Sequence, residues 1–274
     1  DSSPNAYDGR LINFTNRSEP YFKGEIAQVR IWDVARTATE IANNLLEVNP
    51  ETTGLLAYYD FNDGIPEGDN TQITQLSDNT SNNFSGNILG FDLQDTISNF
   101  GEATLPSAGS PTGTLKFDGF GDNIEIPSLA TYKDNYTIET WFKTEEDGTL
   151  FSWSPSGGES DWAEGGITFF IQSGGIAVDV YNVGGPWGVR KGGANITDNQ
   201  WHHVAFSIEK DISDINERIR IYIDGVLESE TFFNFSDIIN DGSSNFISKI
   251  GFTNRNFPFL DISNGGLTPS SNSN

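Results

Sequence analysis

The sequence INFTNR at residues 12–17 returns almost unchanged as IGFTNR at residues 250–255, close to the other end of the 274-residue chain. An aromatic residue next to a proline follows each copy within a few positions. The offset of 238 residues, from 12 to 250, is longer than a solenoid or propeller repeat and close to the length of one β domain. We therefore predict that the chain holds slightly more than one period of a repeated or permuted unit.

Most of the sequence outward from these copies follows the two-residue alternation of β-strands. TIETWF (137–142) and RIRIYI (218–223) place apolar side chains on one face and polar ones on the other. Asp224-Gly225 follows the second run and predicts a two-residue hairpin turn. The 29 glycines separate many short runs, as in a many-stranded sandwich. We predict an all-β, two-sheet antiparallel β-sandwich.

One short helix and two irregular segments interrupt this pattern. Thr37 to Glu40 is a capping box that predicts a helix start, and Ile41 and Leu45 then share one face. Residues 62–113 are rich in Asn, Ser, Thr, Asp and Gly, so we expect mostly loop with one or two short strands. Residues 264–274 read as a flexible linker.

The composition excludes several classes of function. With 15 basic and 39 acidic residues, the net charge of −24 argues against nucleic-acid partners. The same charge favours solubility or the binding of a divalent cation. The absence of cysteine excludes disulfides and thiolate metal sites, and two adjacent histidines, expected to face in and out, argue against a zinc site. No apolar run is long enough for membrane insertion.

Three further stretches carry the pattern of a known family. They are GEIAQVRIWD (24–33) with GLLAYYDFNDG (54–64), LKFDGFGDNIEIP (115–127) and DNQWHHVAF (198–206). Read together, they resemble the laminin G-like and pentraxin branch of the concanavalin A-like jelly rolls. The resemblance implies a jelly-roll sandwich that recognises ligands outside the cell.

The order of these stretches departs from that family, in which the strand resembling GEIAQVRIWD follows the one resembling IGFTNR. We therefore predict one apparently circularly permuted domain at residues 10–263. Its N-terminal strands, at 21–33 and 54–62, would complete the sheets made by 114–252, because the sandwich would otherwise leave a sheet edge open. The alternative is the tail of one domain followed by a truncated second.

The six tryptophans fall into two groups. Those in alternating strand contexts are expected in the core: Trp32, Trp141 and Trp201. Those in glycine-rich stretches are candidates for stacking on sugar rings: Trp153, Trp162 and Trp187. Arg190, near the last of these, could pair with an acidic or sulfated sugar. The alternative is that the second group folds back over the end of the sandwich.

The resemblance also implies a calcium site on two loops. By position, the pentraxin ligands correspond to Glu159 and Asp161 on one loop and to Asn254 and Asn256 on the other. Oxygen ligands of this kind suit Ca²⁺. A separate ion near Asp118 and Asp122 is conceivable, but tight-turn chemistry beside two glycines explains these aspartates without a metal.

One pattern suggests catalysis instead. Glu159, Asp161 and Glu164 have the E-x-D-x-x-E spacing of laminarinase-type glycoside hydrolases, which need both glutamates about 5 Å apart on one strand face. Glycine pairs flank the motif and favour a loop, so we predict that the chain is not an enzyme.

We therefore predict a secreted or cell-surface module, of bacterial type, for recognition or adhesion. Its partner would be a glycan or cell-surface polysaccharide, bound with the help of Ca²⁺. The chain is expected to be a monomer, with strand swapping possible between its two INFTNR-like copies. A purely structural spacer is the remaining alternative.

Overall fold

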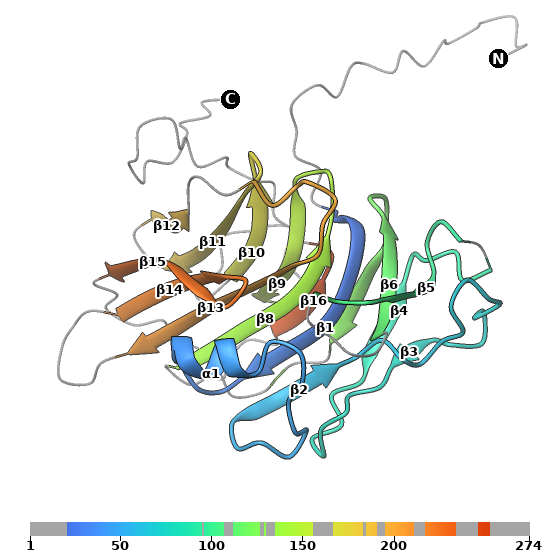
Figure 1. Cartoon of the computed structure of the whole chain (residues 1–274), viewed down its shortest axis with the longest axis horizontal. Helices are drawn as coiled ribbons and strands as arrows, with labels where there is room; N and C mark the ends of the chain where they lie inside the picture. The colour runs from blue at the N-terminus through green and yellow to red at the C-terminus, as the bar shows by residue number, and fades with distance from the viewer. Residues whose placement is uncertain are drawn as a thin grey trace, which may run out of the picture.

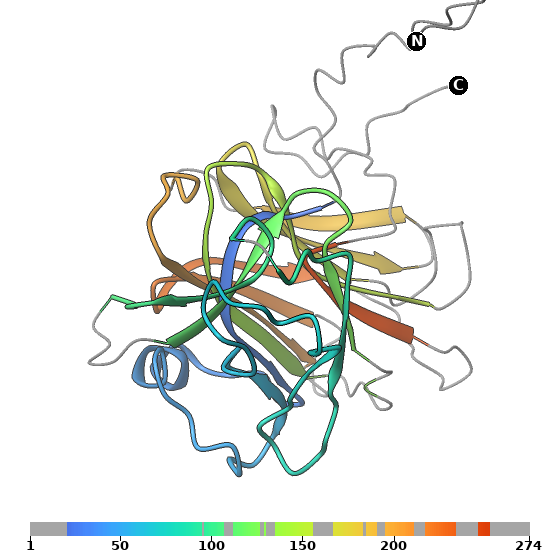
Figure 2. The same cartoon turned by 90° about the vertical axis from the view of Figure 1, so that its right-hand side faces the viewer.

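The computed structural model describes residues 21–94, 96–106, 112–126, 129, 135–155, 167–182, 185–190, 195–210, 217–233 and 246–252. It confirms the predicted all-β architecture, with two antiparallel sheets packed face to face (Figures 1 and 2). No helix in the described residues is long and apolar enough to cross a membrane.

Within the described residues, each sheet contains eight strands. The first runs in the order β15 (Val226–Phe233), β14 (Glu217–Ile223), β13 (His202–Lys210), β8 (Tyr136–Lys143), β1 (Lys23–Trp32), β6 (Thr112–Asp118) and β5 (Phe100–Ala103), with β2 (Leu55–Tyr59) paired to β1. The second runs in the order β12 (Gly185–Arg190), β11 (Gly175–Asn182), β10 (Ile167–Gln172), β9 (Gly148–Pro155), β16 (Phe246–Ile250), β7 (Asn123–Ile126), β4 (Gly86–Leu89) and β3 (Gln75–Leu76).

Strand β1, near the front of the sequence, lies in the middle of the first sheet (Figure 1). Along one edge it pairs with β8, where Ile26 faces Phe142. Along the other edge its first half pairs with β6, where Ile26 faces Leu115, and its second half pairs with β2, where Ile31 faces Ala57. The N-terminal strands therefore supply interior positions of the sandwich.

The front and the back of the described chain meet where β1 begins. The amide of Phe22 donates to the carbonyl of Gly251 at 2.8 Å, and Tyr21 forms an antiparallel bridge with Phe252. This junction links the start of β1, in the first sheet, to the end of β16, in the second. The predicted domain limits at residues 10 and 263, and the linker at 264–274, lie outside the described residues and stay predictions.

The main core fills the space between the sheets, because every strand turns alternate side chains inward. Its largest fully buried members include Phe22, Phe100, Phe142, Phe151, Phe169 and Phe206. Burying each such ring contributes about 1.5–3 kcal/mol. Aromatic residues from both sheets thus hold the layers together.

The predicted helix and hairpin are both confirmed. Helix α1 (Ala38–Asn43) begins with the capping box, in which the amide of Glu40 donates to Thr37 Oγ1 and the amide of Thr37 donates to Glu40 Oε2. Ile41 packs on Ala205 and Tyr222, so the helix covers the outer face of β13 and β14. The turn at Asp224-Gly225 has φ of 50° and 79°, the positive values of a two-residue hairpin.

Parts of the glycine-rich segments form strands, and one expectation for them is wrong. GPWGVR forms strand β12, where residue 187 pairs with Val180 of β11, because the backbone ladder of an edge strand tolerates glycine. Trp153 lies on β9 between β10 and β16 and is only 2% exposed, so its indole belongs to the core and is not a sugar platform. In addition, residues 62–113 contain three short strands, β3, β4 and β5.

Candidate binding groove

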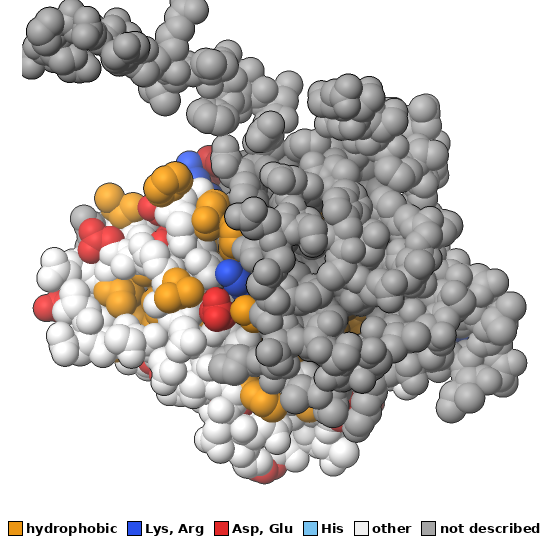
Figure 3. Space-filling view, turned by 180° about the vertical axis from the view of Figure 1, so that it is seen from behind, with side chains coloured by type: hydrophobic (Ala, Val, Ile, Leu, Met, Phe, Trp, Pro, Cys, Tyr) orange, Lys and Arg blue, Asp and Glu red, His pale blue; other side chains and the backbone are white. Residues whose placement is uncertain are grey.

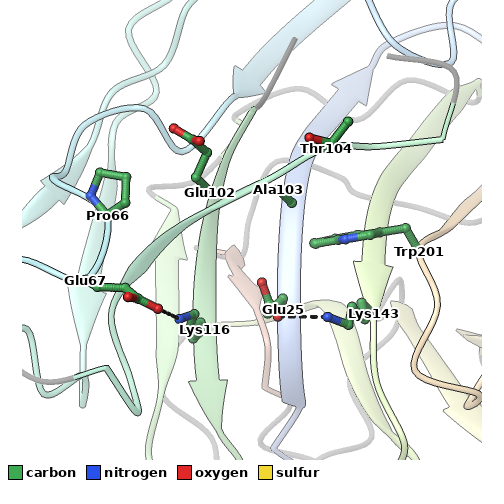
Figure 4. A pocket seen from close by; sticks show the side chains of 9 residues that line it. All are labelled: Glu25, Pro66, Glu67, Glu102, Ala103, Thr104, Lys116, Lys143 and Trp201. Carbon is green, nitrogen blue, oxygen red and sulfur yellow. Dashed lines mark hydrogen bonds and ion pairs between the residues drawn. The ribbon is translucent and has the colours of Figure 1, made fainter. Parts of the chain in front are cut away.

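A groove of about 430 Å³ lies on the outer face of the first sheet, away from the core (Figure 4). Three neighbouring strands form its floor and turn charged side chains toward it: Glu25 on β1, Lys116 on β6 and Lys143 on β8. Alternation explains this placement, since the next residues along, Ile26, Leu115 and Phe142, face the core.

The walls of the groove come from segments distant in sequence. Trp201 forms one side, Pro66 and Glu67 form the other, and the segment through Ala103 and Thr104 passes across the face (Figure 4). Trp201 packs against a cluster that contains Ala27, Leu105 and Trp141 and remains partly exposed. Trp32 and Trp141 are buried as predicted, but Trp201 is a wall of the groove and only in part a core residue.

Most charges in the groove are paired. Lys116 Nζ lies 3.0 Å from Glu67 Oε1, and Lys143 Nζ lies 3.4 Å from Glu25 Oε1 (Figure 4). Thr114 Oγ1 also donates to Glu25 Oε2 at 3.5 Å. The side chain of Glu102 is exposed and forms no hydrogen bond or ion pair with another described residue.

The described part of the opposite side of the molecule looks different. There, hydrophobic side chains lie scattered among white atoms, with a few charged side chains between them (Figure 3). The groove combines an indole with several carboxylates and ammonium groups.

A second polar cluster on the same sheet is closed to ligands because α1 and its flanking residues cover it. Glu139 is fully buried and accepts from Trp32 Nε1 at 2.9 Å and from Arg36 Nη1 at 3.0 Å. Arg30 Nη1 lies 3.5 Å from the same carboxylate. Burial, helped by the positive charge of Arg30, lowers the pKa of His203 to about 3, so this imidazole is neutral. The cluster anchors the N-terminal segment to the sheet.

The DGFGD turn between β6 and β7 has the tight-turn chemistry that the sequence predicts. Gly119 and Gly121 have φ of 87° and 85°. Asp118 Oδ1 accepts from the amide of Phe120 at 2.6 Å, and Asp122 Oδ2 accepts from the amide of Asp118 at 2.7 Å. Groups of three or more metal-ligating side chains are absent from the described part of the chain.

The pKa values of Asp122 and His202 are both raised. Burial raises the pKa of Asp122 to about 6, although the hydrogen bond from Ser98 Oγ, at 2.6 Å, opposes the shift. The hydrogen bond between His202 Nδ1 and Asp224 Oδ2, at 3.0 Å, raises the pKa of His202. As predicted, one histidine faces inward and the other outward, His203 being buried and His202 partly exposed.

Replacing Asp122 with asparagine is expected to change how stability depends on pH. The folded-state pKa lies above the ordinary aspartate value of 3.8, so the contribution of Asp122 is fully present below pH 3.8 and is lost as the pH rises through about 6. The Asp122→Asn variant should therefore gain about 1–3 kcal/mol on the wild type between about pH 4 and about pH 7. Urea unfolding across this range measures the difference.

Asp69→Asn is the control, because the hydroxyl of Thr71 lowers the pKa of that exposed carboxyl. Its contribution is lost as the pH falls below 3.8 and is present above it. The difference in stability between the control and the wild type should therefore stay nearly constant over most of the range in which Asp122→Asn gains stability. Parallel curves for the wild type and Asp122→Asn would contradict the prediction.

Most site residues predicted from the sequence cannot be placed. Outside the described residues lie Trp162, Glu159, Asp161, Glu164, Asn254 and Asn256. The side chains of Trp187 and Arg190 are likewise not described, although both residues belong to β12. Sequence reasoning missed the charged floor of the groove. Alternation could have identified the charged residue on the polar face of each of the three strands. It could not have shown that these strands lie side by side in the sheet.

The sandwich and its groove define a concanavalin A-like module with a recessed, charged surface beside a tryptophan. A family model described as the concanavalin A-like lectin/glucanases superfamily, of laminin G type, matches residues 117–261. This is more than half of the chain, and the chain belongs to that family. Strands β1 and β2 lie outside the matched residues, although both are part of the first sheet.

Solved structures similar to the chain include domains LG4-5 of the mouse laminin α1 chain, at 14% identity and a TM-score of 0.37, covering 50% of this chain and 35% of that one. The binding domain of botulinum neurotoxin serotype D/C, strain VPI 5993, has 13% identity and a TM-score of 0.33, covering 66% and 45%. The chain spans less than half the length of either structure. No curated protein matches it.

Proposed function

We propose that the chain is a carbohydrate-recognition module of a larger secreted or cell-surface protein, and that the groove holds part of a glycan. The observation that carries the proposal is the partly exposed indole of Trp201 beside a row of carboxylate and ammonium groups. Binding sites for small polar ligands combine an apolar wall with a few polar groups in this way.

The groove has the groups needed to hold a sugar ring. The indole of Trp201 is backed by Trp141 and Leu105, so it is a rigid platform for the C–H face of a pyranose. Glu25 and Glu102 can accept hydrogen bonds from sugar hydroxyls, and Lys116 and Lys143 can donate to ring and glycosidic oxygens. Because the groove is open to solvent, we expect a single groove to bind a glycan with modest affinity.

Calcium and a second contact region belong to the same proposal. We propose that Ca²⁺ is held by Glu159, Asp161, Asn254 and Asn256, with Trp162, Trp187 and Arg190 contributing to glycan contact. The support is the oxygen-rich character of these loop residues, which suits calcium, together with the membership of the family. An extracellular location follows from the same proposal.

Trp201→Ala is expected to abolish most glycan binding. Truncating an aromatic anchor at a binding site costs about 2 kcal/mol, or about thirtyfold in affinity. The measurement is a glycan array probed with the wild type and the variant, each in calcium and in EGTA. Loss of the wild-type signal in EGTA would support the calcium part of the proposal.

Phe120→Ala is the matched control, because Phe120 is an aromatic residue with 83% exposure that does not line the groove. This variant should keep the wild-type pattern, and circular dichroism should show that both variants are folded. A Trp201→Ala protein that binds the same glycans as strongly as the wild type would place the site elsewhere. A blank array for the wild type would favour a structural spacer.

A further inference from the structure

We propose that the groove selects sugars that carry a positive charge, and specifically amino sugars whose amine is free. The inference rests on the carbohydrate binding proposed above and specifies the class of ligand. It follows from the balance of charge around Trp201.

The two lysines of the groove are already neutralised. Lys116 pairs with Glu67 at 3.0 Å and Lys143 pairs with Glu25 at 3.4 Å. An anionic sugar that recruited either ammonium group would leave a carboxylate unpaired beside it, and like charges at such distances repel. The lysines therefore do not make the groove a site for acidic glycans.

Glu102 carries the one negative charge in the groove that no described lysine neutralises. It is exposed on β5 at the rim of the groove, and no partner for it exists among the described residues. Three carboxylates against two ammonium groups give the groove one net negative charge. The chain as a whole carries −24, so its long-range field also attracts cations and repels anions.

Trp201 strengthens the same preference. The face of an indole attracts a cation through its quadrupole, and tryptophan is the best side chain for this interaction. A glycan with an amine on each ring can place one amine near Trp201 and another near Glu102, since both residues line the groove. A neutral sugar would gain only the stacking and the hydrogen bonds.

The test compares three hexasaccharides with one β-1,4 backbone that differ only at carbon 2, where they carry an amine, an N-acetyl group or a hydroxyl. Calorimetry uses the full chain at mildly acidic pH, where amines are protonated and glutamates are ionised. We expect the amine form to bind about two- to fivefold more tightly than the hydroxyl form, the range typical of one exposed ion pair. The advantage should disappear in about 1 M salt.

Glu102→Gln should remove most of the preference for the amine form, measured as the ratio of the affinities for the amine and hydroxyl forms. Glu47→Gln is the matched control, since it makes the same change in net charge at an exposed residue outside the groove, and it should leave the preference intact.

Equal affinities for the three sugars, no binding of the amine form, or equal effects of the two variants would each overturn the inference. The proposed carbohydrate binding would still be tested separately by the glycan array with Trp201→Ala, because that experiment does not depend on sugar charge.

Discussion

Replacing Glu139 with glutamine is expected to lower the free energy of unfolding by about 3–5 kcal/mol, the usual cost of breaking a buried ion pair from one side. The ion pairs of Arg30 and Arg36 within the described chain both end on this carboxylate. Glutamine keeps the shape and can still accept the bonds from Trp32 and Arg36. It would nevertheless leave two buried guanidinium groups without a counter-charge.

No neighbouring group can replace the lost charge. His203, whose Nε2 lies 3.5 Å from Glu139 Oε2, is neutral because burial lowers its pKa, and it cannot compensate a guanidinium. Arg30 also donates to the carbonyl of Asn44, and Arg36 donates to the side chain of Asn44. Displacing either guanidinium group would therefore weaken the attachment of the segment around α1. We expect local loosening of this segment before global unfolding.

Urea unfolding followed by tryptophan fluorescence measures the effect, and hydrogen exchange over residues 33–50 tests the loosening. The control is Glu146→Gln, since the pair of Glu146 with Lys23 has both side chains more than half exposed, and exposed pairs contribute about 0–1 kcal/mol. Equal stabilities for the two variants would show that the buried cluster is not what anchors the N-terminal segment.

The same residue shows where sequence reasoning reached its limit. TIETWF was correctly predicted to be a strand, because alternation is a local property. The residues of its polar face, Glu139 and Thr137, are nevertheless fully buried. The residues that cover them lie about one hundred positions earlier in the chain, and alternation within six residues carries no information about such a cover.

The groove was missed for a related reason, whereas the capping box and the hairpin were found because their signals lie within four residues. Glu25, Lys116 and Lys143 become neighbours only when β1 inserts between β6 and β8. The sequence predicted that the N-terminal strands would close an open sheet edge, but it indicated neither the position of β1 between β6 and β8 nor the register that aligns the three side chains. Long-range register decides the site, and local patterns do not encode it.

Gly251 explains why the two INFTNR-like copies are not interchangeable. It has φ of 82°, and a Cβ placed on it would lie 2.4 Å from Phe117 Cε1, a buried ring of the core. The first copy has Asn13 at the matching position. Asparagine tolerates a positive φ, but its side chain would have to displace Phe117. The position at the end of β16, beside β9 and β7, therefore suits the second copy and rejects the first.

Gly251→Asn should accordingly destabilise the protein by about 1–3 kcal/mol, the usual cost of overpacking a core. Gly121→Asn is the matched control, since Gly121 has nearly the same φ, 85°, and nothing within 4 Å of its Cβ. The difference between the two variants in urea unfolding isolates the collision with Phe117 from the backbone preference. Equal stabilities would mean that Phe117 moves at little cost, and then residues 12–17 could compete with 250–255 for this position within one molecule or between two.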